Sequence, residues 1–424
     1  MQSVSAKDNF YHKILKLVIP IIIQNLLSAA VSSADVVMLN YVGQSSISAV
    51  SLAANYASVL FMIYYGLGTG ASMLSAQYWG KGDLQPIRAV QGIAMRFSLV
   101  ISLGFSGFAF FAPELMMKLF TNDTELITIG AGYLRVMAVT YLCWGIIEVY
   151  LAILRSIGRV TVCMVLNVMA FTLNIFLNAV FIFGLFGAPQ LGATGVAIAT
   201  ALSRIIELIG CIVVSMFSKD IKLKSSYMFL RNRLLFQDFV RLSLPALGND
   251  IAWSIAFSMY SVILGHMGSD AVAANSLVIV VRNFGTVLCF GTASAGGILL
   301  GNVMGEGNME HAKSYASKLM KLTVIMGAAV NTTLIAGVFR AGGDSRFGLI
   351  CDVIDMWVYA VPLGFLAAFV FKLPVLWVYF LLCTDEFVKW PWVIRHYRSG
   401  KWLKNITRED LFAAETAAKS SGGA

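Results

Sequence analysis

The stretch that decides the fold lies near the start of the chain, at residues 14–41: ILKLVIPIIIQNLLSAAVSSADVVMLNY. It is apolar over more than the roughly 20 residues that a helix needs to cross a bilayer. Asp35 is the only charged residue among the 64 that separate Lys16 from Lys81. The stretch therefore predicts a membrane-spanning helix that carries one isolated acid.

Four polar side chains share one side of this predicted helix. At about 100° per residue, Gln24, Ser28, Ser32 and Asp35 lie in a stripe about 80° wide. A carboxylate that faces lipid costs at least about 3 kcal/mol, so the stripe is predicted to face protein or a water-filled cavity. An acid that only bonds neighbouring helices is the alternative. Acids inside membranes more often mark functional sites, so we favour an ion or proton site.

The composition extends this prediction to the whole chain. Of its 424 residues, 58% are hydrophobic and only 12% are charged, which is typical of an all-α polytopic membrane protein. Eleven apolar segments are expected to span or enter the bilayer: 14–41, 47–76, 91–112, 127–153, 161–184, 193–217, 243–266, 273–303, 315–340, 347–370 and 374–394.

The basic residues predict the orientation. The net charge is +9, and most of the 31 Lys and Arg fall in loops or at helix ends on one side, a group that includes Arg155, Arg340 and Lys389. Because basic loops stay in the cytoplasm, we expect cytoplasmic termini in a plasma (inner) membrane. The excess charge is then explained by anionic lipid, and we expect no nucleic-acid partner.

The two halves of the chain repeat. A shift of 225 residues places Pro20 on Pro245, and Gly82 on Gly307. Further on, a shift of 185 places Gly158 on Gly343. The second half is thus shorter by about 40 residues, which correspond to 106–145 of the first half. Since an even number of spans precedes each half, the repeat is parallel, with an axis along the membrane normal.

These matches give the predicted organisation. Residues 1–217 form a first six-helix lobe, and 218–238 form a basic cytoplasmic linker. Residues 239–408 form a second lobe that is truncated between 321 and 340, and 409–424 form a disordered tail.

The sequence motifs resemble those of the multidrug and toxic compound extrusion (MATE) family. They are Pro20 with Asp35 and Gly43, Gly80-Lys81-Gly82-Asp83, Arg155-Ser156-Ile157-Gly158, Pro245 with Asn249-Asp250, Gly305-Glu306-Gly307-Asn308, and Arg340-Ala341-Gly342-Gly343-Asp344. The resemblance covers roughly 17–407 and is strongest to the DinF-like branch, whose coupling acid lies in the first helix. It implies a monomeric two-lobed antiporter, not an enzyme and without a cofactor. Such antiporters expel amphipathic, often cationic compounds in exchange for H⁺ or Na⁺.

The coupling ion is predicted to bind near Asp35. Asn174 and Asn178 share one face of the 161–184 helix, so we expect them beside Asp35, where the three residues are candidate Na⁺ ligands. Related proteins often carry a second carboxylate at the position of Asn178, which makes Glu148 a candidate substitute acid. Alternatively, Glu148 forms an ion pair with Arg155 and does not act as the second acid. Thr200 completes the predicted coupling set.

A substrate cavity is predicted from aromatic and polar residues that face the inside of the helices, since aromatic rings bind cations. Its expected lining is Gln24, Ser28, Tyr64, Trp144, Arg204, Asp250, Trp253, Phe257 and Arg282. We also expect Arg204 to pair with Glu207. Asp352 and Asp355 are expected to anchor an inner helix end.

Two other functions stay open at this point. A flippase for a lipid-linked headgroup would need several arginines in its cavity, and only Arg135, Arg204 and Arg282 are expected within the membrane, away from the helix ends. A transport-deficient membrane scaffold is the other alternative, because of the short second half.

Whether the short second half is compromised depends on the topology of residues 313–346. The 18 uncharged residues of 322–339 suffice for one crossing, yet basic residues flank both ends. A half-depth hairpin that turns within 327–333 satisfies the charges, whereas one helix keeps every backbone hydrogen bond. The sequence favours a single fused helix over 313–340, and hence about eleven spans and a misdirected C-terminus.

Overall fold

A computed structural model describes residues 10–39, 41–325, 330–409 and 411 of the chain. Within these residues every regular element is a helix. Nine of the helices are long and apolar enough to cross a membrane. The prediction of an all-α polytopic membrane protein is therefore confirmed.

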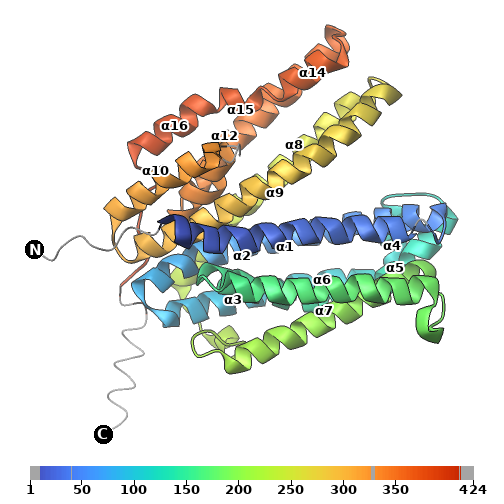
Figure 1. Cartoon of the computed structure of the whole chain (residues 1–424), viewed down its shortest axis with the longest axis horizontal. Coiled ribbons are helices and arrows are strands. Elements are labelled where there is room, and N and C mark those ends of the chain that lie inside the picture. Colours follow the sequence, from blue (N-terminus) through green and yellow to red (C-terminus); the bar gives the residue numbers. More distant parts are fainter. Residues whose placement is uncertain (1–9, 40, 326–329, 410, 412–424) are drawn as a thin grey trace, which may run out of the picture.

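The first lobe is a bundle of long antiparallel helices (Figure 1). Its elements are α1 (Phe10–Leu39), α2 (Gln44–Lys81), α3 (Leu84–Phe111), α4 (Pro113–Lys118), α5 (Thr124–Ser156), α6 (Val160–Phe183), the 3₁₀ turn η1 (Leu185–Gly187) and α7 (Gly192–Phe217). Pro20 lies inside α1 and removes one helical hydrogen bond there. The largest described core cluster combines buried apolar residues of α2, α3, α5, α6 and α7 with Leu235, Phe239, Leu242 and Ala246 of the second lobe.

The second lobe repeats this order with shorter pieces. Its elements are α8 (Arg233–Gly265), α9 (Ser269–Gly305), α10 (Met309–Ile325), α11 (Val330–Thr332), η3 (Thr333–Phe339), α12 (Ser345–Val353), η4 (Ile354–Ala360), α13 (Val361–Phe365), η5 (Leu366–Val370), α14 (Val375–Leu382), α15 (Asp385–Val388) and α16 (Trp390–Ser399). The segments η3, η4 and η5 are π-helical turns, which are uncommon and widen the helix locally.

The repeat is visible in the backbone. Gly82, which caps α2, has φ 79°, and Gly307 has φ 81°. Gly158 has φ 81°, and Gly343 has φ 74°. Left-handed turns thus recur at both shifts read from the sequence, since glycine adopts them without steric cost.

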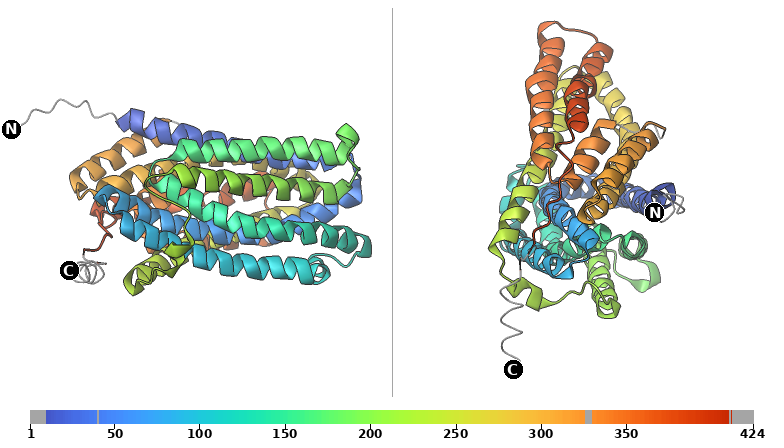
Figure 2. Two further views of the ribbon diagram at one scale, coloured as in Figure 1. Left: turned by 90° about the horizontal axis from the view of Figure 1, so that it is seen from below. Right: turned by 90° about the vertical axis from the view of Figure 1, so that its left-hand side faces the viewer.

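The two lobes meet where α2 crosses α9. A Cβ added to Gly80 would lie 1.9 Å from the backbone O of Asn302, and one added to Gly305 would lie 1.9 Å from the O of Gln77. The shift of 225 maps Gln77 on Asn302 and Gly80 on Gly305. The crossing therefore pairs equivalent residues, as at a twofold axis. The lobes diverge from this end of the molecule toward the opposite end (Figure 1). Figure 2 shows them from two further sides.

The fused helix predicted over 313–340 is wrong. The Oγ1 atoms of Thr323 and Thr333 lie 3.4 Å apart, whereas ten residues of one helix would separate them by about 15 Å. α10 and η3 are therefore the two legs of a hairpin, the alternative that satisfies the flanking charges, and its connection 326–329 lies outside the described residues. Buried partners explain why it forms, because Asn331 Nδ2 donates to the backbone O of Glu386 at 2.7 Å.

The predicted linker packs against the first lobe. Gln91 Nε2 donates to the O of Lys222 at 3.2 Å, and Arg88 Nη2 donates to the O of Asp220 at 3.3 Å. The 3₁₀ turn η2 (Ser225–Phe229) contacts α3, where a side chain in place of Gly92 would overlap the O of Tyr227. The segment between the lobes thus lies along α3.

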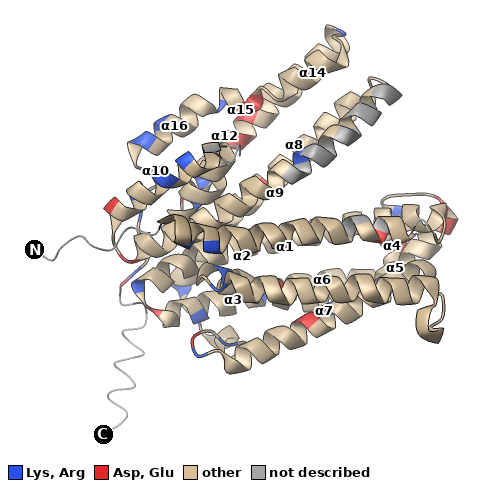
Figure 3. Cartoon of the chain, viewed as in Figure 1, with Lys and Arg blue, Asp and Glu red and all other residues tan. Residues whose placement is uncertain are grey.

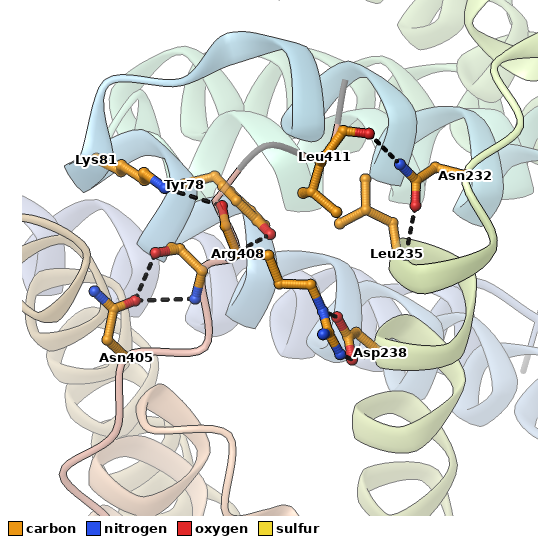
Figure 4. A network of polar contacts seen from close by, with 9 residues as sticks. Tyr78, Lys81, Asn232, Leu235, Asp238, Asn405, Arg408 and Leu411 are labelled. Carbon is orange, nitrogen blue, oxygen red and sulfur yellow. Dashed lines mark hydrogen bonds and ion pairs between the residues drawn. The ribbon is translucent and has the colours of Figure 1, made fainter. Parts of the chain in front are cut away.

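A C-terminal segment, Gly400–Arg408, crosses the end where the lobes meet (Figure 4). Arg408 binds Asp238 of α8 through Nε at 2.5 Å and Nη2 at 2.7 Å, and its backbone N donates to Tyr78 Oη at 3.0 Å. Lys81 Nζ donates to the O of Arg408 at 2.9 Å. The hydrogen bond to Asp238 raises the pKa of the Arg408 guanidinium. One segment therefore joins α2 of the first lobe to α8 of the second. Of the predicted tail, all but 409 and 411 lies outside the described residues.

Most Lys and Arg lie toward this same end of the molecule (Figure 3). Lys118 is an exception, because it is the last residue of α4, which lies at the opposite end of the first lobe (Figure 1). This is the distribution that the sequence predicts for the cytoplasmic side.

Candidate functional site

A cavity of about 780 Å³ lies between the lobes. Its lining comes from α1, α2, α5, α6 and α7 on one side and from α8, α9, α11, η3, α12 and Lys389, which lies between α15 and α16, on the other. Of the residues predicted for the site, the structure places these in its lining: Gln24, Ser28, Tyr64, Trp144, Glu148, Arg204, Asp250 and Trp253.

Aromatic rings cover much of the first-lobe side. Trp144 stacks on Phe61 with centroids 5.8 Å apart and meets the edge of Tyr64 at 6.0 Å. The guanidinium of Arg204 lies 5.3 Å from the Trp144 ring centroid. Tyr64 Oη also bonds Ser102 Oγ at 2.5 Å, which fixes its ring. The surface is therefore apolar with few, well-anchored polar groups, as small-molecule sites usually are.

Glu148 fits both of its alternatives. It lines the cavity, and its carboxylate accepts from Trp144 Nε1 at 3.3 Å and lies 3.5 Å from Arg155 Nη2. The described contacts do not join it to Asp35. The predicted Arg204–Glu207 ion pair also forms, at 2.7 Å.

Three basic residues that the sequence assigned to the cytoplasmic surface line the cavity instead: Arg155, Arg340 and Lys389. Arg340 Nη2 lies 2.7 Å from Asp250 Oδ1, and Lys389 Nζ lies 3.6 Å from Asp352 Oδ1. Their burial is possible because each contacts an acid. The repeat could have indicated that both arginines occupy equivalent positions in the two lobes, since the 185-residue shift maps Arg155 on Arg340.

Phe257 and Arg282 lie outside the central cavity. They line a smaller pocket of about 330 Å³ with Trp253, between α8 and α9. The Arg282 guanidinium lies 4.2 Å from the Phe257 ring centroid, so the two side chains cover each other. Their predicted place in the cavity is therefore wrong.

Asp35 lies at the head of a hydrogen-bond chain that crosses three helices. Asn178 Nδ2 donates to Asp35 Oδ1 at 2.6 Å and to Asn174 Oδ1 at 3.2 Å. Asn174 Nδ2 donates to Thr200 Oγ1 at 3.1 Å, and Thr200 donates to the O of Val196 at 2.9 Å. The structure thus brings together four of the five residues of the predicted coupling set, from α1, α6 and α7. Of the polar stripe on α1, the side chain of Ser32 lies outside the described residues.

Asn178 Nδ2 donates toward the acid, and the remaining hydrogen bonds of the chain donate away from it, toward Val196. Asp35 consequently acts as an acceptor, which suits an ionised carboxylate. Asn178 is fully buried, and its Oδ1 has no hydrogen-bond partner in the described part of the chain. This oxygen is available to a donor or a cation that arrives at Asp35.

Comparison with known proteins agrees with this architecture. The model of the family described as MatE matches residues 20–180 and 245–336, which is more than half of the chain. The chain belongs to the MatE family. The DinF-like branch stays a prediction.

Similar proteins include an uncharacterized transporter, YisQ, of Bacillus subtilis (strain 168). It is 26% identical over 432 residues, which cover 91% of this chain and 93% of the relative. A probable multidrug resistance protein, NorM, of Thermotoga maritima is 24% identical over 451 residues, 94% of each chain.

Solved structures share the fold. An outward-facing multidrug resistance MATE family transporter of the MOP superfamily superposes with a TM-score of 0.80 at 21% identity, covering 92% of this chain and 96% of that one. A MATE in the straight conformation gives a TM-score of 0.80 at 20% identity, covering 91% and 96%. The MatE chain described here is thus a multi-pass membrane transporter by family and fold.

Proposed function

We propose that this protein is an ion-coupled antiporter that exports amphipathic, cationic compounds by alternating access. The names of its NorM relatives support multidrug efflux. The proposal for cationic substrates comes from the aromatic rings in the cavity lining.

One observation carries the coupling proposal, and it concerns α1. The same helix contributes Gln24, Asn25 and Ser28 to the cavity lining and Asp35 to the hydrogen-bond chain. Seven residues, or about 10 Å of helix, separate Ser28 from Asp35. A change in how Asp35 binds α6 therefore acts on a helix that shapes the substrate cavity.

The ion step follows from the donors and acceptors. When Asp35 takes up a proton it gains an O–H donor, and as a neutral acid it accepts more weakly from the Nδ2 of Asn178. The amide then gains from turning its unpartnered Oδ1 toward the new O–H. That exchange breaks the bond to Asn174 and alters how α1 packs on α6, which biases the lobes toward another arrangement. Na⁺ would use the same oxygens as ligands.

The lipid-linked flippase is the less favoured function. The cavity does contain four basic residues, but each of them contacts an acid: Arg155, Arg204, Arg340 and Lys389. A pyrophosphate would have to displace those acids. The number of basic residues in the cavity therefore does not by itself support a flippase.

Purified protein in proteoliposomes tests the proposal. With ethidium as the probe, a pH gradient and a Na⁺ gradient are imposed separately at zero membrane potential. We expect ethidium to accumulate against its own gradient with one of the two ions and not in liposomes without protein. No accumulation with either ion, together with movement of a lipid-linked pyrophosphate probe between leaflets, would establish the flippase instead.

A further inference from the structure

Three arginines are expected within the membrane, and the structure gives two of them an acid as partner. Arg135 lies 2.7 Å from Glu114, and Arg204 lies 2.7 Å from Glu207. Within the described residues, Arg282 contacts no acid, and the partner of its guanidinium is an aromatic ring. Arg282 is therefore the membrane arginine whose charge no described side chain balances.

The acids on the two helices beside Arg282 are too distant or already paired. Asp270 is the other charged residue of α9, and it lies twelve positions before Arg282, about 18 Å along the helix. On α8, Asp250 lies seven positions before Phe257, about 10 Å along the helix, and it pairs with Arg340 at 2.7 Å. An isolated cation inside a membrane is costly, and a ligand of opposite charge would compensate it.

Arg282 lines the pocket of about 330 Å³ between α8 and α9. The described lining contains no acid, and beside Arg282 and two aromatic rings it consists of hydroxyl side chains: Ser254, Ser258, Ser261 and Thr286. Three of these hydroxyls donate to the carbonyl four positions earlier, at 3.0 Å from Ser258, 3.4 Å from Ser261 and 2.8 Å from Thr286. A hydroxyl can rotate its hydrogen from such a bond toward a ligand. The pocket thus offers guanidinium and hydroxyl donors, with no described carboxylate to compete for them.

An oxyanion fits this set of donors better than a cation does. A guanidinium presents its N–H groups in a planar fork that matches two oxygens of a carboxylate or phosphate. The Phe257 ring lies 4.2 Å from the guanidinium and covers one face of it, which leaves the N–H groups at its edge free to donate. A cation would instead add a second positive charge next to Arg282.

The pocket adjoins the central cavity. Trp253 and Ser254 line both of them. On α8 the pocket lining continues from Trp253 to Ser261, which is about 12 Å of helix. A volume of about 330 Å³ is at the lower limit for ligand pockets, so it suits one charged group of a ligand whose remainder occupies the cavity of about 780 Å³.

We propose that Arg282 and the hydroxyls around it form an oxyanion subsite, which binds the carboxylate or phosphate of an amphiphile whose apolar body packs on Trp253. Two sources supply this chemistry: a substrate that carries a carboxylate as well as a cation, and a phospholipid. With a substrate as the source, the inference rests on the proposed function of the central cavity. With a phospholipid as the source it does not, and in neither case does it depend on ion coupling.

Equilibrium dialysis of two dyes against the full chain in detergent micelles tests the subsite, with protein-free micelles as the blank. Rhodamine B carries a free carboxylate, and its methyl ester has the same cationic ring system without that charge. Arg282→Gln should weaken binding of rhodamine B by about tenfold or more and that of the ester by less than about twofold, because only the acid loses a charged hydrogen bond. Ser258→Ala with Ser261→Ala should weaken rhodamine B by about two- to fivefold. Arg135→Gln, which replaces an arginine at 53% exposure, is the matched control and should change neither dye.

Native mass spectrometry with phosphatidylglycerol distinguishes the two sources. If the lipid is the occupant, Arg282→Gln should retain one phosphatidylglycerol fewer than the wild type, and the lipid should displace rhodamine B but not its ester. If a substrate carboxylate is the occupant, lipid retention should be equal and only the dye affinities should differ. The proposal is overturned if Arg282→Gln changes neither lipid retention nor the ratio of the two dye affinities. A wild type that binds neither dye contradicts the proposed drug cavity, and lipid retention then decides the subsite by itself.

Discussion

Asn178 Nδ2 lies 2.6 Å from Asp35 Oδ1, although 143 residues separate the two along the chain. The contact joins α1 to α6 inside the first lobe, and it continues through Asn174 to Thr200 of α7. An ion that binds Asp35 therefore competes with a bond that holds three helices together.

Asp35→Asn should abolish ion-coupled export. The substitution keeps the volume of the side chain, replaces one acceptor oxygen by an NH2 donor, and removes the charge. We expect ethidium accumulation in proteoliposomes to fall at least tenfold, which corresponds to about 1.4 kcal/mol. The control is Glu125→Gln, an exposed acid at the start of α5, which should keep wild-type transport. Wild-type accumulation by Asp35→Asn would refute the assignment.

Asn178→Ala should uncouple transport without unfolding the protein. The mutant leaves Asp35 without its donor and Asn174 with one bond fewer. The loss of a hydrogen bond to a charged group costs about 1.5–3 kcal/mol, so the pH dependence of export should shift. Asn178→Asp should retain pH-dependent export, because it supplies a second titratable oxygen pair. An unchanged pH profile in Asn178→Ala would argue against the chain of bonds as the coupling element.

Gly80→Ala should destabilise the interface between the lobes. Its new Cβ would lie 1.9 Å from the O of Asn302, so α2 and α9 must separate. Overpacking of this kind costs about 1–3 kcal/mol. Gly104→Ala is the matched control, since it also lies in a helix but has no atom within 4 Å of the new Cβ. Fluorescence-detected thermal unfolding should show a lower midpoint for the first variant only.

Cysteines at positions 323 and 333 should form a disulfide in a variant that lacks the six native cysteines. The hydroxyls of Thr323 and Thr333 are 3.4 Å apart in the hairpin. Ser48→Cys with Ser58→Cys is the control, because both lie in α2 and are ten residues apart, which is about 15 Å. Mass spectrometry should detect the crosslink in the first pair alone. Two free thiols at 323 and 333 under oxidising conditions would instead support a continuous helix.

Arg408→Ala should ease opening at the end where the lobes meet. The pair with Asp238 is bidentate, yet the Arg408 side chain is 42% exposed, so the effect is limited by solvent screening. We expect a cysteine placed at Ser72, which lines the cavity, to react about two- to fivefold faster with an impermeant thiol reagent added from that side. Asp238→Arg combined with Arg408→Asp should return the rate toward that of the wild type. Equal rates in all variants would show that the C-terminal segment does not hold this end closed.

The sequence by itself determined the membrane fold, the approximate spans, the two-lobed repeat with its two shifts, and the polar stripe of α1. These features follow from hydrophobicity and spacing, which are local properties that add along a helix. Gly82 and Gly307, for example, were recognisable in sequence because a left-handed turn favours glycine.

Only the tertiary structure decided which polar groups meet. The one-sided distribution of basic residues placed Lys389 at the cytoplasmic end of a helix, but packing of α15 against η4 buries it among acids 3 to 37 residues away. The hairpin of 313–340 was missed for a related reason. Backbone hydrogen bonds within one helix can be counted from sequence, whereas the buried amide of Asn331 that satisfies Glu386 comes from 55 residues earlier in the chain. Charged and polar groups in a membrane are stabilised by partners, and the identity of those partners is set by how helices pack.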